Sequence, residues 1–433
     1  MGLLVGPVLS ATPELREAVT RKVDAEYASL EAIYRDLHAH PELSFMEVRT
    51  AGMIAAEWRG LGLEVTEKVG NTGVVGVLRN GPGPTVLVRG DMDALPIREA
   101  TGLPYASTAI VKDLSGNDRP AMHACAHDTH VTGLIGTARV LSALKDRWSG
   151  TIVFVAQPAE EIVAGARAML ADGLYTRFPK PDYALALHTV AYLPAGKIGY
   201  GEGPFLANVS SLDIQVRGVS GHGSAPDTAK DPVVLASQIV LALQTIVSRE
   251  VKPGKTAVVT VGTIRGGTKR NIISDEVKLE LTLRSYEEEV MDRLIASIRR
   301  ICRGTAEAAG VPADRLPVVT VTDETSPATV NEAKLTRRLA ATFTDWFGAD
   351  RVAASSPITA AEDFTFYGRT VERVPICIWW VGATAPGKFE ESKRTGIPVP
   401  SNHNFGFAPE PEPTLKTAVT SMTAAVLELL AKR

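Results

Sequence analysis

Residues 85–93 read TVLVRGDMD and join the two features that decide the fold. An apolar run, Val86–Val88, is followed closely by two carboxylates, Asp91 and Asp93. Comparable apolar runs, each separated from the next by a helical stretch, are GVVGVL (73–78), TIVFVAQ (151–157) and YALALH (183–188). Continuous apolar strands that alternate with helices are typical of a mostly parallel sheet with both faces covered. We therefore predict an α/β fold around such a sheet.

Side chains with metal affinity gather where these strands end. Glu160 and Glu161 come just after the strand at 151–157, and His188 closes the strand at 183–188. The segment MHACAHDTH (122–130) holds three histidines and one cysteine, although the whole chain has only 8 histidines and 3 cysteines. In open α/β sheets, ligands bind outside the carboxyl ends of the strands. Each group alone is an ordinary cap, surface or core feature, but their coincidence at strand ends favours a metal centre.

The overall composition limits the classes of function. The chain of 433 residues suggests two domains, and its 45% hydrophobic and 22% charged residues are typical of a soluble globular protein. With a net charge of -3 and no basic stripe, we expect no nucleic-acid partner. We find no Lys/Arg cluster and no apolar run of the ~18 residues that span a bilayer, and we expect no membrane partner. Three scattered cysteines make no disulfide framework.

The N-terminal residues leave the compartment open. Residues 1–10 are apolar and small, as at the end of a signal peptide, but they lack a basic beginning. A frayed N-terminal segment explains them as well. We therefore favour a soluble cytoplasmic protein, with export to the periplasm as the alternative.

The sequence pattern changes after about residue 205. Between 207 and 323 the expected elements follow the order β-α-β-β-α-β, which is that of ferredoxin-like units. We predict an inserted domain at 207–323 and a discontinuous catalytic domain formed by 1–206 and 324–433. Because an exposed face of the inserted domain could pair with a second copy, we also predict a homodimer.

The chain resembles the M20 family of metallopeptidases, in the subgroup of N-acyl-amino-acid amidohydrolases that is hippurate hydrolase-like and indole-acetyl-amino-acid hydrolase-like. The motifs that carry the resemblance run in family order over about residues 30 to 430: LHAHPELSFME, RGDMDALPI, MHACAHDTH, QPAEE, ALHT, GHGSAPDTAKDP, KRNIISD, TLRS, AEDF and SNHNF. The resemblance implies a zinc-peptidase-like α/β catalytic domain with an inserted ferredoxin-like α+β lid and dimerisation domain. It also implies two divalent ions per chain, with Zn, Mn and Co as the candidates.

Residue roles follow from the same resemblance. Five positions match metal ligands: Cys125, His127, Glu161, His188 and His403. Cys125 is expected to bridge the two ions, and Glu160 matches the general base. His222, in the inserted domain, matches a histidine that steadies the reacting oxygen.

Four further positions are expected to support the site. Asn271 and Arg284 match lid residues near the substrate. Asp93 could hold a ligand histidine in one tautomer. Asp128 could do the same, and it could equally cap a helix.

The sequence departs from the family pattern at several positions. Ala126 stands between the cysteine and the histidine where glycine is usual, which suggests a different turn or a tighter pocket. Asp227 replaces a frequent histidine, Ser274 replaces a proline, and the acidic pair that often follows His403 is missing. None of these changes removes a proposed metal ligand, so we expect an active site.

The resemblance implies that a metal-activated water hydrolyses the amide bond of N-acylated amino acids. Glu160, beside the ligand Glu161, would carry the proton from the water to the leaving amine. A dipeptidase or carboxypeptidase acting on short peptides is the alternative, because the same centre cleaves peptides. A metal-bearing binding protein without activity is a second alternative, against which the intact Glu160 speaks.

Overall fold

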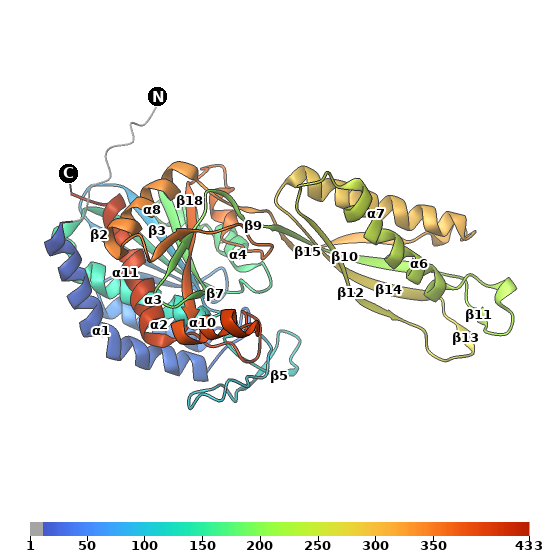
Figure 1. Ribbon diagram of the computed structural model, residues 1–433, viewed down its shortest axis with the longest axis horizontal. Helices are drawn as coiled ribbons and strands as arrows, with labels where there is room; N and C mark the ends of the chain where they lie inside the picture. The colour runs from blue at the N-terminus through green and yellow to red at the C-terminus, as the bar shows by residue number, and fades with distance from the viewer. Residues whose placement is uncertain (1–11, 433) are drawn as a thin grey trace, which may run out of the picture. The chain divides into compact units, whose positions relative to one another are not determined.

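The computed structural model describes residues 12–432, which form two compact units (Figure 1). Unit 1 comprises Met1–Gly203, Val330–Ser356 and Asp363–Arg433, and unit 2 comprises Pro204–Thr329 and Pro357–Glu362. The range 207–323 that we predicted for the inserted domain falls within the first segment of unit 2, and the short segment 357–362 is additional. The apolar stretch 1–10 lies outside the described residues.

Unit 1 is built on an eight-stranded sheet in the order β1-β2-β6-β3-β7-β18-β8-β17. The strands are β1 (Glu64–Val69), β2 (Gly73–Asn80), β6 (Gly150–Gln157), β3 (Thr85–Asp91), β7 (Tyr183–Pro194), β18 (Ile376–Thr384), β8 (Ile198–Tyr200) and β17 (Val352–Ala354). The central strands β6, β3, β7 and β18 are parallel to one another. Strand β1 runs antiparallel to β2, β2 runs antiparallel to β6, and β8 runs antiparallel to β18. The expected α/β fold with a mostly parallel central sheet is confirmed.

The strand that carries His188 is longer than the sequence suggested. We expected the strand at 183–188 to end at His188, but β7 continues to Pro194. The reason is that β18 keeps pairing along one side of β7 as far as Pro194, whereas the pairing with β3 on the other side stops at Ala186. His188 therefore lies just beyond the point where β7 loses one neighbour.

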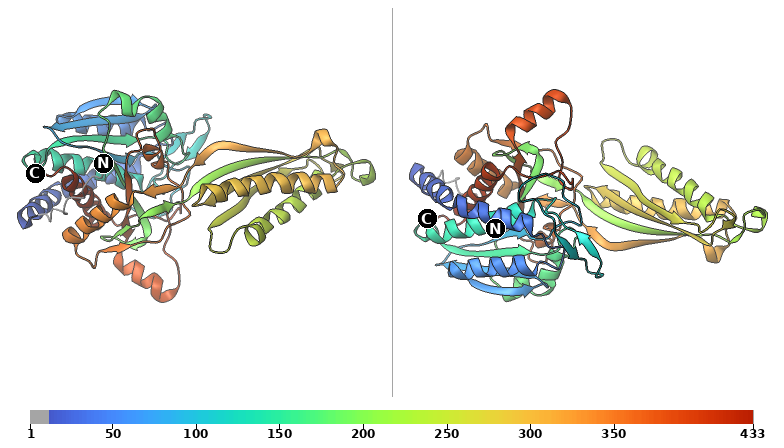
Figure 2. Two further views of the ribbon diagram at one scale, coloured as in Figure 1. Left: turned by 90° about the horizontal axis from the view of Figure 1, so that it is seen from above. Right: turned by 90° about the horizontal axis from the view of Figure 1, so that it is seen from below.

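Helices cover this sheet and bury its apolar residues. Helix α3 (His127–Ala143) contacts β3, β6 and β7, and α1 (Pro13–Ala39) and α11 (Pro411–Leu429) pack along α3 (Figure 2). The other helices of unit 1 are α2 (Val48–Gly60), α4 (Gly165–Ala171), α5 (Leu174–Arg177), α8 (Ala333–Phe347), α9 (Thr365–Gly368) and α10 (Pro386–Thr395). Because 14 of the residues of α3 are buried, its first turn is held firmly against the ends of the strands.

Unit 2 has a four-stranded antiparallel sheet in the order β12-β14-β10-β15, with helices α6 and α7 packed on it (Figure 1). Its elements are β10 (Asn208–Arg217), α6 (Pro232–Thr245), β12 (Ala257–Gly266), β14 (Glu276–Ser285), α7 (Glu288–Ala308) and β15 (Val318–Ser326). Two shorter strands, β11 (Gly221–His222) and β13 (Ile272–Ile273), form a separate pair. This chain order is the β-α-β-β-α-β order of ferredoxin-like units.

Helix α6 continues into a turn at Ile246–Glu250, and the combined segment is strongly apolar. The segment Pro232–Glu250 is long and apolar enough to cross a membrane by length and composition, contrary to our reading of the sequence. One face packs into the core of unit 2 through Leu235, Ile239 and Leu243. The exposed face also carries polar side chains such as Gln244. The packing is that of an amphipathic helix on its own sheet.

Candidate metal centre

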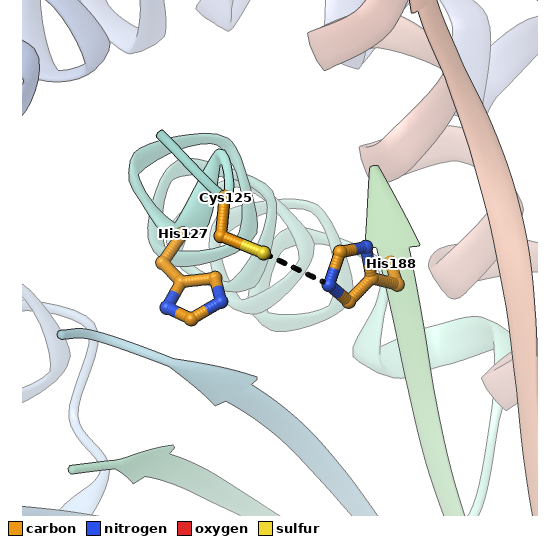
Figure 3. A group of neighbouring side chains, drawn as sticks. All are labelled: Cys125, His127 and His188. Atoms are coloured by element: carbon orange, nitrogen blue, oxygen red, sulfur yellow. Dashed lines mark hydrogen bonds between the residues drawn. The ribbon is translucent and has the colours of Figure 1, made fainter. Parts of the chain in front are cut away.

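A left-handed turn places two potential ligands at the start of α3. Ala126 lies between Cys125 and His127 with φ at 67°, and its carbonyl accepts hydrogen bonds from the amides of Thr129 and His130. Alanine in this conformation costs about 1–2 kcal/mol relative to glycine. Figure 3 shows the Cys125 side chain pointing toward the His188 ring on β7, with His127 beside it. The turn that differs from the family pattern is thus formed here by alanine.

Two groups of donor atoms share Cys125. In the first, Cys125 Sγ lies 3.5 Å from His188 Nε2, and His127 completes the group. In the second, Cys125 Sγ lies 3.3 Å from His403 Nε2, which is 3.4 Å from a Glu161 oxygen. Ligand atoms around one Zn²⁺ lie about 3–4 Å apart, given bond lengths of about 2.0–2.3 Å. All five proposed ligands therefore come together, with the thiol common to both groups.

Hydrogen bonds fix the ring nitrogen that each buried histidine offers. His127 Nδ1 donates to the carbonyl of Asp93 at 2.7 Å, and His188 Nδ1 donates to the carbonyl of Thr189 at 2.9 Å. Since a carbonyl only accepts, both Nδ1 atoms carry the proton. Both Nε2 atoms are left with a lone pair for a metal ion, which is the arrangement typical of histidine ligands.

Unpaired buried atoms show that the donor set fits a cation. Among residues 12–432, His127 Nε2 and Glu161 Oε1 are buried without a hydrogen-bond partner, and they face each other at 3.9 Å. Burial raises the pKa of Glu161 to about 8. Although burial lowers the pKa of His127, the nearby charge of Asp91 holds it well above its usual range. The pocket therefore favours positive charge, which divalent ions would supply.

Asp93 ties the proposed base to the ligands. Its two carboxylate oxygens accept from the amides of Glu160 and Glu161, each at 3.0 Å, and Ser44 donates to it at 2.7 Å. Glu160 Oε2 lies 3.9 Å from His127 Nε2, so the carboxylate of Glu160 faces the donor atoms. One carboxylate oxygen of Asp93 also lies 3.4 Å from His127 Nδ1.

Asp128 has a different partner from the one that we considered. Its carboxylate accepts from His38 Nδ1 at 2.7 Å and from the amide of Thr129. Within residues 12–432 it forms no hydrogen bond with a proposed metal ligand. His38 Nε2 donates to Glu99 at 3.0 Å. Asp128 thus anchors the first turn of α3 to α1.

The three remaining site candidates lie in unit 2. His222 is exposed on β11, and its Nδ1 accepts from the amide and the hydroxyl of Ser224 at 3.1 and 2.7 Å. Asn271 lies next to the same pair of short strands, where its carbonyl accepts from the amide of Gly223. Arg284 lies on β14, and burial lowers its pKa.

A buried polar network beneath the donors was not identified from the sequence. Arg89 donates to Asp91 at 2.6 Å, to Gln157 at 2.9 Å and to Asp363 at 3.0 Å. Asp91 in turn accepts from His130 Nδ1 at 2.5 Å. Two features of the sequence point toward this network: Asp91 stands at the end of a strand, and residues 362–363 are an acidic pair. Nothing in the local sequence predicts that Arg89 pairs with Asp363, which lies 274 positions away.

Three comparisons place the chain among known proteins. Hippurate hydrolase from Campylobacter jejuni is 36% identical over 339 residues, which cover 78% of this chain and 84% of the relative. Thermostable carboxypeptidase 1 from Saccharolobus solfataricus is 35% identical over 354 residues, or 81% of this chain and 84% of the relative. The structure is similar to the YXEP protein of Bacillus subtilis, described as a dinuclear metal-binding peptidase of the M20 family, with a TM-score of 0.74, 28% identity and coverage of 94% and 99%.

The family description agrees with these relatives. Residues 87–393 match peptidase family M20/M25/M40, and this range contains all the proposed metal ligands except His403. The match, the relatives and a donor set suited to metal ions all indicate a metal-dependent hydrolase. The chain belongs to peptidase family M20/M25/M40.

Proposed function

We propose that this protein hydrolyses the amide bond of N-acylated amino acids, using two divalent ions held by five ligands. The ligands would be Cys125, His127, Glu161, His188 and His403. The observation that carries the proposal is that Cys125 belongs to both donor groups. Glu160 belongs to neither of these two groups, but its carboxylate faces the same donor atoms. A ligand shared by two donor groups, together with a separate carboxylate, suits a hydrolase with two ions. Zn, Mn and Co all remain candidates, because thiolate favours Zn whereas imidazole and carboxylate also bind the others.

The chain's own groups divide the chemistry. When bound, the ions supply a water of lowered pKa and polarise the substrate carbonyl. Glu160 would take the proton of that water and give it to the nitrogen of the leaving amino acid. Asp93 would keep Glu160 in place by accepting a hydrogen bond from the backbone amide of Glu160.

Three residues of unit 2, His222, Asn271 and Arg284, are our further candidates for contacts with the substrate. His222 accepts from Ser224 at Nδ1, so the proton of its neutral ring is on Nε2, ready to donate to the oxygen of the reacting carbonyl. Arg284 is paired through its backbone with β10 and β12, but its guanidinium has no hydrogen bond or ion pair in the part of the chain that the structure describes. A guanidinium of this kind suits the carboxylate of an amino acid. Asn271 would add a polar contact.

Short peptides are the second candidate substrates. The similarity to a carboxypeptidase is as strong as the similarity to hippurate hydrolase. A peptide differs from an N-acyl amino acid only by the amine on the acyl side, and the residues described above do not discriminate against it. We favour N-acyl amino acids because the sequence motifs resemble that subgroup.

The experiment that tests this function compares substrates and a base variant. Metal-reconstituted protein should release amino acids from N-acetyl and N-benzoyl substrates faster than from dipeptides, measured by amino-group detection. Glu160→Gln should lower kcat by about 100-fold or more while both ions stay bound, because the amide cannot accept the proton. Glu161→Gln is the matched control, since it should lower the metal content as well. Turnover by metal-loaded Glu160→Gln near the wild-type rate would contradict the assignment.

We also propose that unit 2 joins two copies of the chain. In its sheet, β12 is an edge strand, and α6 beside it exposes Val234 at 53% and Leu241 at 73%. A hollow of about 380 Å³ lies between them, lined by Val240, Leu241, Val261 and Ile264 among others. An open edge next to an apolar helix is suited to pairing with an identical edge by two-fold symmetry.

A further inference from the structure

The loop that carries Glu160 and Glu161 has a strained backbone. Ala159 has φ at 49° and Val163 has φ at 56°, a conformation that is rare for alanine and exceptional for a β-branched residue. The loop closes tightly, because the amide of Gly165 donates to the carbonyl of Ala159 and a Cβ at Gly165 would lie 1.6 Å from the Pro158 oxygen. Such strain persists only where the surroundings fix the conformation.

Two buried carboxylates supply that constraint at the front of the loop. The amides of three successive residues, 159 to 161, all donate to them. The amide of Ala159 donates to Glu47 at 2.9 Å, and those of Glu160 and Glu161 donate to Asp93 at 3.0 Å each. Asp93 also contacts the proposed ligand His127, whereas within residues 12–432 no hydrogen bond joins the Glu47 side chain to a proposed metal ligand.

Glu47 lies in the sequence segment HPELSFME, which contains none of the residues that we propose for the reaction. Its side chain is fully buried. The same oxygen that holds Ala159 also accepts from the amide of Phe45 at 2.9 Å, and Phe45 is itself left-handed with φ at 61°. Its other oxygen accepts from Thr72 at 2.5 Å. One carboxylate therefore holds two backbone positions of positive φ.

This carboxylate is costly to keep in the interior. Within residues 12–432, no lysine, arginine or histidine forms an ion pair with Glu47. Burial, together with the charge of Asp93, raises its pKa to about 7. A buried polar group of this kind destabilises the fold unless its hydrogen bonds compensate. A carboxyl group that is retained in spite of this cost, and that holds a strained loop, indicates a functional reason.

We propose that Glu47 is a positioning residue for the hydrolysis. It fixes the left-handed turn at Ala159 and thereby directs the Glu160 carboxylate toward His127 Nε2. Glu47 does not touch the reacting atoms. Without its oxygen, the amide of Ala159 loses its acceptor and the turn can relax to an ordinary φ. Glu160 would then leave the position from which it moves the proton. The inference rests on the proposed function of Glu160.

The test compares three variants of Glu47 in the metal-reconstituted full-length protein. Glu47→Ala and Glu47→Asp should lower kcat by about 10- to 100-fold, the usual effect of removing support from a metal-site residue, with KM nearly unchanged and both ions retained. Aspartate keeps the charge but is one methylene too short. Glu47→Gln should keep kcat within a few-fold of wild type, because its amide oxygen can still accept from Ala159. A crystal structure of Glu47→Asp should show Ala159 with a negative φ.

Glu42, from the same segment, is the matched control. Its carboxylate accepts from the amides of Arg49 and Thr50 at 2.9 and 2.8 Å, which caps α2, and it does not contact the loop. Glu42→Ala should lower the melting temperature without changing kcat. If Glu47→Asp and Glu47→Ala keep wild-type kcat, or lose activity only in proportion to lost metal, the proposal is wrong. If Glu47→Ala does not fold, the contrast between Glu47→Asp and Glu47→Gln decides. Failure of the wild type on every N-acyl amino acid would instead reject the proposed function.

Discussion

Cys125 is the residue on which both donor groups depend, so it provides the most direct test of a binuclear site. Burial raises the pKa of its thiol well above the usual value, and only a nearby cation would make the thiolate favourable there. Cys125→Ala should therefore lose at least one of two ions per chain, measured by elemental analysis after dialysis. Cys377→Ala, which removes a buried thiol of the core strand β18, should retain both. Two tightly bound ions in Cys125→Ala would show that the thiol is not a ligand.

Ala126 shows how one methyl group affects the metal loop. Its left-handed conformation costs about 1–2 kcal/mol, and its methyl packs with Ala191, Ala383 and Phe407, a burial that stabilises by about 0.8 kcal/mol. Because the two effects oppose each other, Ala126→Gly should change the free energy of unfolding by less than about 1 kcal/mol.

Ala124, buried in the same loop without a positive φ, is the control for Ala126. Ala124→Gly relieves no strain, removes a buried methyl group and increases the conformational entropy of the unfolded chain. It should therefore lower the free energy of unfolding by about 1–2 kcal/mol. Thermal unfolding of both variants measures the difference. If both cost the same, the alanine at 126 is not strained in solution.

At the scale of single residues, candidate metal donors are easier to recognise in the sequence than the residues that support them. Cys125, His127 and His188 are recognisable because metal-binding side chains are rare and stand near strand ends. Glu47 and Arg89 are not, because each acts through partners distant in the chain: Glu47 through Ala159, 112 positions away, and Arg89 through Asp363. Their identity depends on which segments the fold brings together, and one sequence does not show this.

Among the elements, α1, α3 and the loop at 95–108 meet at one buried histidine. His38 of α1 lies between Asp128 of α3 and Glu99 of the loop, at 2.7 and 3.0 Å. Although burial lowers the pKa of His38, the two carboxylates raise it to about 10. A raised folded-state pKa means that this stabilisation is complete below the usual value of 6.5 and is lost as the pH rises toward about 10.

This arrangement predicts a specific pH dependence of stability. Between pH 7 and 10, the free energy of unfolding should fall more steeply for wild type than for His38→Gln, because only the wild type loses the buried charge. At neutral pH the variant should cost about 3–5 kcal/mol, since two buried carboxylates lose their cation. His40→Gln changes an exposed histidine of the same segment and should match wild type at each pH in urea unfolding. Parallel curves for His38→Gln and wild type would contradict a charged His38.

The elements that the sequence did not reveal share one property, which is a lack of local pattern. Strand β18 lies in the middle of the sheet, yet its run ICIWWVGAT is apolar throughout and could equally be a buried helix. The extension of β7 beyond His188 depends on β18, so it was missed for the same reason. The elements of unit 2 were easier, because strands such as β14 alternate buried and less buried residues along their length.

For the whole molecule, the proposed association through unit 2 makes the last prediction. Pairing of two β12 edges would join the four-stranded sheets into one of eight strands, and the apolar faces of α6 would cover each other. A stable interface buries at least about 1,000 Å². The wild type should therefore sediment with the mass of two chains, and Leu241→Glu, which places two charges in the interface, should sediment as one. Val371→Glu alters a valine of unit 1 that is 93% exposed and should leave the dimer intact. A single-chain mass for wild type at micromolar concentration would refute the association, whereas a dimer that Leu241→Glu leaves unchanged would place the interface on another surface.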